Sequence, residues 1–287
     1  MGRLLALTAI LAATGMAGQE GRRAARDYPK DGVYWVGTWK EAIGEAANRN
    51  VPIFVAFHKD GSAPCDALAS VYRDRRFIES SRMWVNVVAH PGTTHDADVE
   101  VGGKKVPRCE RYFEISCREH ADLYEKLSRE LKVDSEPPVR VYLNLNEVGR
   151  DAGARSLGDL IKAMDQIQSK VEGEKVHADT WRKAVAFRSE GDKAVQQAEW
   201  QKAIKAYREI GKLGAKPLES LCASLLNKVN SEGEKLHTKA YDAQPKDNKG
   251  EFTATKKILR GIIRDFKSLP IADKAKSYLE ALEKHGH

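Results

Sequence analysis

The chain of 287 residues is poor in cysteine and has few long apolar runs. Four cysteines are too few for a disulfide-dense scaffold, and 10 prolines and 22 glycines are too few for a collagen-like or low-complexity chain. Only the N-terminus carries a long apolar run, so we expect no membrane-spanning helix in the mature protein. The remaining composition, 41% hydrophobic and 31% charged, is typical of a globular protein, and the length predicts two domains.

Three familiar catalytic motifs are also absent. The sequence contains no G-x-x-x-x-G-K-[ST] phosphate loop, no H-E-x-x-H zinc-protease helix and no G-x-S-x-G nucleophile elbow. We expect no cofactor, and the cysteines and histidines are left as the candidates for chemistry.

The N-terminus has the pattern of an export signal. Arg3 precedes a short apolar stretch, and Gly15 and Ala17 are small residues before a cleavage point. We predict a signal peptide over residues 1–17, a flexible lead over 18–32 and a periplasmic or extracellular location. An uncleaved N-terminal helix is the alternative.

Charge is unevenly distributed along the chain. Residues 18–173 hold 24 Lys+Arg and 25 Asp+Glu, whereas residues 174–287 hold 23 and 16, an excess of +7. The positive residues are scattered and are not interleaved with aromatic residues, which favours a solvated helical surface over a nucleic-acid surface. We therefore expect no nucleic-acid partner.

The first domain alternates strands and helices. Continuous apolar runs of strand length are typical of strands that are covered on both faces. The patterns predict strands over residues 51–57, 83–89 and 139–145 and helices after Thr38, from the turn at 58–65 through Leu68 and Tyr72, over 120–132 and after Ser156. A short strand is expected near 33–35 and another before the last helix.

This order resembles the thioredoxin-like family over about residues 33–172. The strand at 51–57 leads into a turn and a cysteine-bearing helix, and Pro137-Pro138 precedes the strand at 139–145. The resemblance implies an α/β domain with a central mixed sheet flanked by helices. It also implies that Pro138 is the family's cis-proline.

The chain departs from the family where the chemistry takes place. A thiol–disulfide oxidoreductase needs Cys-x-x-Cys, but the matching tetrad is Ser62-Ala63-Pro64-Cys65. Ser62 replaces the attacking cysteine and is expected to cap the helix. Cys65 keeps the resolving position, either as an inert core residue or as a lone reactive thiol.

An insertion over residues 91–119 holds two further cysteines. Residues 99–106 predict a hairpin around Gly102-Gly103 that ends at Pro107. In an exported protein Cys109 and Cys117 are expected to form a disulfide worth about 2.5 kcal/mol. The alternatives are a metal site of Cys109, Cys117 and His120, with His90 or His95 as the fourth ligand, and a relocated redox pair with Cys65.

Residues 176–287 are predicted to be helical. Apolar residues at spacings of three and four run through 181–188, 194–213, 218–229, 252–266 and 271–282. Paired helices of this kind resemble tetratricopeptide-like repeats and imply a helical-hairpin domain that binds another protein. The alternative is that these helices only extend the first domain.

These observations favour an exported thioredoxin-like module that has lost disulfide chemistry and serves as an interaction domain. A thiol–disulfide enzyme using Cys65 with Cys109 and Cys117, and a metal or redox sensor at Cys109, Cys117 and His120, are the alternative hypotheses.

Overall fold

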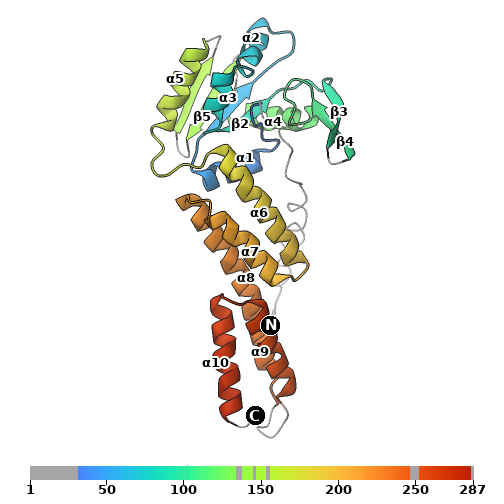
Figure 1. Cartoon of the computed structure of the whole chain (residues 1–287). Coiled ribbons are helices and arrows are strands. Elements are labelled where there is room, and N and C mark those ends of the chain that lie inside the picture. Colours follow the sequence, from blue (N-terminus) through green and yellow to red (C-terminus); the bar gives the residue numbers. More distant parts are fainter. Residues whose placement is uncertain are drawn as a thin grey trace, which may run out of the picture. The chain divides into compact units, whose positions relative to one another are not determined.

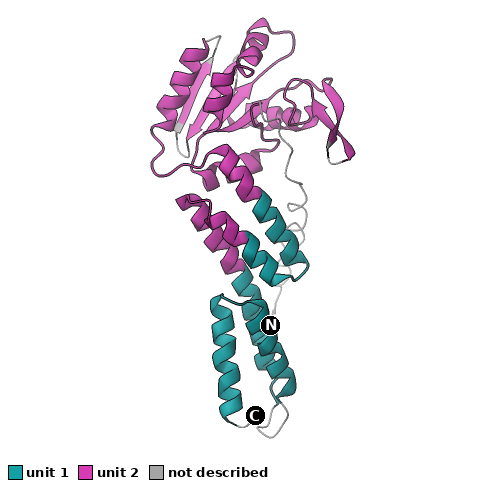
Figure 2. Ribbon diagram, in the orientation of Figure 1, with its two compact units in different colours: residues 1–26, 186–206, 229–287 teal, residues 27–185, 207–228 magenta. Residues whose placement is uncertain are grey.

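A computed structural model describes residues 32–101, 103–133, 138–144, 147–152, 156–245 and 252–285. The predicted signal peptide and nearly all of the predicted lead therefore lie outside the described residues. The chain forms two compact units (Figure 2). One comprises Asp27–Val185 and Tyr207–Lys228, and the other includes Ala186–Ala206 and Val229–His287.

The first unit contains a four-stranded mixed sheet in the order β2-β1-β5-β6 (Figure 1). Its strands are β1 (Ile53–Phe57), β2 (Val85–Ala89), β5 (Val139–Asn144) and β6 (Glu147–Ala152). β1 pairs in parallel with β2 and antiparallel with β5, which pairs antiparallel with β6. The segment near residue 35 makes only an isolated parallel bridge, from Trp35 to Asn86, instead of the expected short strand.

Side-chain oxygens cap the N-termini of four helices in the α/β part of this unit. The helices of this part are α1 (Trp39–Arg49), α2 (Ala63–Val71), α3 (Arg75–Ser81), α4 (Cys117–Glu130) and α5 (Leu157–Gln168). Thr38 and Ser156 cap α1 and α5 as expected, and Asp74 caps α3. α4 begins three residues earlier than expected because Ser116 forms a capping box with Glu119.

Helices cover both faces of the sheet. On one face, Phe54 and Ala56 of β1 belong to a cluster that includes residues of α2, α3 and α5. On the other face, Ile53, Val55 and Phe57 join a cluster with residues of α1 and α4. β1 and β2 are buried along their whole length, which explains their continuous apolar runs.

The predicted hairpin is confirmed but is longer than expected. β3 (Asp96–Val101) and β4 (Lys104–Cys109) pair antiparallel in a separate two-stranded sheet. Pro107 lies within β4, opposite Asp98, and does not end the hairpin. A two-stranded sheet has only edge strands, where a residue without an N–H is tolerated.

The region after residue 177 is helical, as predicted. Its helices are α6 (Ala178–Gln196), α7 (Trp200–Gly211), α8 (Lys216–Asp242), α9 (Thr253–Asp265) and α10 (Pro270–Lys284). The expected helix over 194–213 is interrupted at Ala198, which adopts a left-handed conformation. Pro217 lies in the first turn of α8, where proline is tolerated, and α8 continues past Val229. Within the described ranges, every helix is too short or too polar to cross a bilayer.

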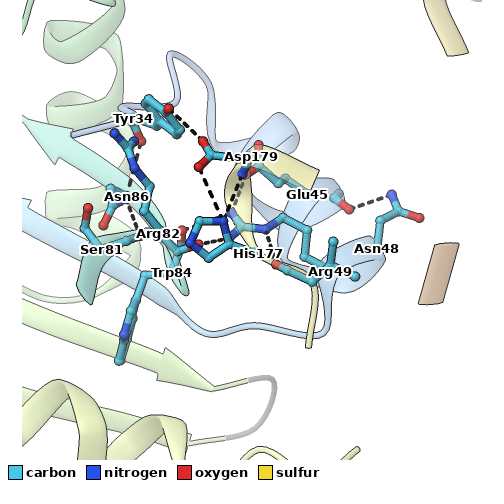
Figure 3. Close-up of polar contacts among 12 residues, drawn as sticks. Tyr34, Glu45, Asn48, Arg49, Ser81, Arg82, Trp84, Asn86, His177 and Asp179 are labelled. Atoms are coloured by element: carbon cyan, nitrogen blue, oxygen red, sulfur yellow. Dashed lines mark hydrogen bonds and ion pairs between the residues drawn. The ribbon is translucent and has the colours of Figure 1, made fainter. Parts of the chain in front are cut away.

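Buried Arg49 joins the segment before α6 to the segment before β2 (Figure 3). Its guanidinium donates to the carbonyl of Val176 at 3.0 Å and to that of Trp84 at 3.0 Å, and it pairs with Glu45 at 2.6 Å. The N–H of Val176 donates to the Arg49 carbonyl at 2.8 Å. The first unit therefore continues beyond α5 and residues 170–175 into α6.

Candidate metal centre

Two cysteines and two histidines meet where the hairpin opens toward α4. One ligand atom from each of His95, Cys109, Cys117 and His120 lies within 4.8 Å of the others. His95 directly precedes β3 and Cys109 ends β4, so the antiparallel pairing places them side by side. Cys117 and His120 are three residues apart in the first turn of α4 and share one face of the helix.

Hydrogen bonds hold the hairpin against α4. The N–H of Cys117 donates to the Asp96 carboxylate at 2.7 Å, and the N–H of Cys109 donates to the Ile115 carbonyl at 2.8 Å. The N–H of His90, which directly follows β2, donates to the His120 carbonyl at 3.1 Å. The four side chains are therefore brought together by the folded insertion and the end of β2.

The imidazole of His120 is fully buried, and only one of its two ring nitrogens makes a hydrogen bond among the described residues. Nδ1 lies 2.7 Å from the carbonyl of His90, which only accepts hydrogen bonds, so Nδ1 carries the proton. Nε2 then holds the lone pair, and it is buried without a hydrogen-bond partner among the described residues. Burial lowers the pKa of His120 to about 4, so the ring is neutral at pH 7 and ready to bind a cation.

In His95, as in His120, one ring nitrogen carries the proton and the other holds the lone pair. Nε2 lies 3.3 Å from the carboxylate of Asp60, an acceptor, so we assign the proton to Nε2. Nδ1 then offers its lone pair toward Sγ of Cys117, 4.0 Å away. A ligating histidine whose other nitrogen donates to a carboxylate or a carbonyl is the usual arrangement in metal sites.

Both cysteines are buried free thiols. Burial, reinforced by hydrogen bonding to Asp96, raises the pKa of Cys117 to about 12, so this thiol is protonated when no cation is present. A divalent metal favours the thiolates, and two thiolates neutralise its charge inside a buried site. Tetrahedral zinc places its nitrogen and sulfur ligands about 3.3–3.8 Å apart, so a contraction of about 1 Å completes the site.

The sequence left His90 or His95 open as a fourth ligand. His95 lies with Cys109, Cys117 and His120, whereas the His90 carbonyl accepts a hydrogen bond from His120. The spacing Cys-x7-Cys-x2-His gave only weak guidance because it is not a standard zinc pattern. Cys65 is not a member of this group. The disulfide between Cys109 and Cys117 stays a prediction, since free thiols and a disulfide are two redox states of one pair.

The turn between β1 and α2 holds the residues that correspond to the thioredoxin motif. Ser62 occupies the predicted N-cap position of α2, although its side chain makes no capping hydrogen bond. Cys65 is fully buried in the first turn of that helix. Pro138 is buried directly before β5, but Pro137 lies outside the described residues, so the predicted cis bond stays a prediction.

No protein-family model matches the chain, and no curated protein matches it.

Proposed function

We propose that the α/β region is a zinc-binding module whose ligands are His95, Cys109, Cys117 and His120. The observation that carries this proposal is the buried Nε2 of His120, which has no hydrogen-bond partner among the described residues and belongs to a group of two thiols and a second imidazole. An unpartnered buried nitrogen costs free energy, and a metal ion removes that cost.

Four protein ligands leave no open position for water or substrate, so the zinc has a structural role. It holds the open end of the hairpin on the first turn of α4. The thiolate and imidazole donors favour zinc over magnesium or calcium, which prefer oxygen ligands.

The metal site stands on a scaffold that we propose to be thioredoxin-like and exported. A mixed sheet with helices on both faces supports this resemblance, as does the cysteine-bearing helix α2 directly after β1. With serine at position 62, the domain serves binding instead of disulfide exchange. The paired helices α9 and α10 support a tetratricopeptide-like region that contacts a protein partner.

Metal analysis of the full-length protein, purified without chelator, tests the zinc site. We expect one equivalent of zinc in the native protein and none in Cys117→Ser. The matched control is Cys222→Ser, which removes another buried thiol and should retain the metal.

Non-reducing peptide mapping separates the alternatives. Free Cys109 and Cys117 with bound zinc support the proposal. A Cys109–Cys117 disulfide in metal-free protein overturns it in favour of a structural disulfide, and a link to Cys65 overturns it in favour of a relocated redox pair.

A further inference from the structure

We infer that Asp60 is a positioning residue of the metal centre, so that the turn between β1 and α2 sets the affinity for zinc. This inference rests on the proposed zinc site and adds a residue that does not touch the metal. Asp60 lies two residues before Ser62, in the same turn as the altered thioredoxin motif.

One oxygen of Asp60 accepts a hydrogen bond from His90 and lies within ion-pair distance of nitrogen atoms of His95 and Arg111. Its Oδ1 lies 3.3 Å from Nε2 of His95, 3.1 Å from Nε2 of His90 and 3.2 Å from Nη1 of Arg111. Arg111 lies between the two cysteines of the insertion, so Asp60 connects this turn to the insertion at several points.

The side chain of His90 supports Asp60 and is not a ligand itself. The N–H of Gly92 donates to Nδ1 of His90 at 2.9 Å, so Nδ1 holds the lone pair and Nε2 carries the proton. A protonated Nε2 donates to Asp60 and has no lone pair for a metal. Although Asp60, His90 and His95 also lie close together, this tautomer makes them an outer shell and not a second cation site.

Close packing at Gly92 restricts the carboxylate further. A Cβ on Gly92 would lie 2.3 Å from Oδ2 of Asp60 and 2.5 Å from Cε1 of His90. Asp60 is therefore held in a defined orientation even though its side chain is 43% exposed.

A carboxylate in this position has two effects on His95. It fixes the ring orientation that points Nδ1 toward the thiols, and its negative charge makes Nδ1 a stronger donor to the metal. Loss of such an outer-shell partner weakens metal binding by about 10–100-fold.

The test is zinc affinity, measured by competition with a chromogenic chelator, in the full-length native protein, Asp60→Ala and Asp66→Asn. Asp66 is a matched control because it also contacts Arg111, at 3.6 Å, but makes no contact with His95 or His90 in the structure. We expect the zinc Kd of Asp60→Ala to rise about 10–100-fold and that of Asp66→Asn to stay within about twofold. When cobalt replaces zinc, the ligand-field absorption of Asp60→Ala should differ from that of the native protein. A substitution that only destabilised the fold would leave this absorption unchanged.

The outcomes separate the two proposals. Native protein that binds no zinc overturns the zinc site and this inference with it. Native affinity in Asp60→Ala overturns the role of Asp60 alone. A weaker Kd also counts against the inference if the metal-free Asp60→Ala protein melts well below the metal-free native protein, because the loss then reflects unfolding.

Discussion

The buried cysteines of the α2 region and of the insertion at residues 91–119 have different surroundings. At the start of α2, Cys65 is buried on an α/β scaffold without a second cysteine three residues upstream, because position 62 is serine. In the insertion, Cys109 and Cys117 lie beside two imidazoles whose other ring nitrogens face a carbonyl and a carboxylate oxygen. The number of buried thiols in a region therefore says little about its chemistry, which depends on the groups that face them.

Zinc removal is expected to change the stability of the insertion more than any of the substitutions below. If free zinc is present at about 1,000 times its Kd, binding stabilises the folded protein by about 4 kcal/mol. We expect calorimetry to show a lower melting temperature for the α/β region after chelation and its recovery after zinc is restored. Cys117→Ser should melt at the lower temperature with or without chelator. An identical melting temperature for native protein before and after chelation would count against a structural zinc.

The substitution Gly92→Ala tests whether the turn and the insertion act together. Its added methyl group would displace Asp60 or His90, so we expect zinc affinity to fall by up to about 100-fold, or about 3 kcal/mol. Gly44→Ala in α1 is the control, because no heavy atom lies within 4 Å of its added Cβ. Equal zinc affinity in the two variants would show that the turn does not constrain the ligands.

Acid should lower the free energy of unfolding through His58, the residue that directly follows β1 and begins the turn before α2. Burial, followed by the nearby charges of His90 and Arg111, lowers the pKa of His58 to about 3. The unfolded chain, with a pKa of about 6.5, takes up the proton first, so this contribution is complete above about pH 6.5 and is lost as the pH falls toward 3.

Urea unfolding at pH 7 and pH 5 measures this effect. Between these values His58 should account for about 2 kcal/mol of lost stability. The variant His58→Gln should lose correspondingly less than the native protein, whereas His285→Gln, at an exposed position, should behave like native protein. The same pH dependence in His58→Gln and native protein would exclude this residue as the source.

The sequence predicted the order of elements well but the residues of the candidate metal centre only in part. Continuous apolar runs and helix caps such as Thr38 and Ser156 are local signals, and the corresponding strands and helices are present. The two cysteines and His120 were recognisable because they are neighbours along the chain. Asp60 was not, because its approach to His95 depends on how the insertion folds back over the turn. The interruption at Ala198 was missed because the apolar spacing continues across it.

The smallest expected effect concerns the turn alone. Ser62→Cys places a thiol at the N-cap of α2, where the helix dipole lowers a thiol pKa, and Cys65 follows three residues later. The new thiolate attacks a substrate disulfide, and Cys65 resolves the mixed disulfide, leaving a 62–65 disulfide and a reduced substrate.

We expect the native protein to accelerate the reduction of insulin by dithiothreitol very little, and Ser62→Cys to accelerate it measurably. The double variant Ser62→Cys/Cys65→Ser should lack this gain, and both variants should keep their zinc, because Cys65 is not part of the ligand group. Turnover by the native protein that disappears in Cys65→Ser would instead make Cys65 the catalytic thiol, and the contrast between the turn and the insertion would then fail.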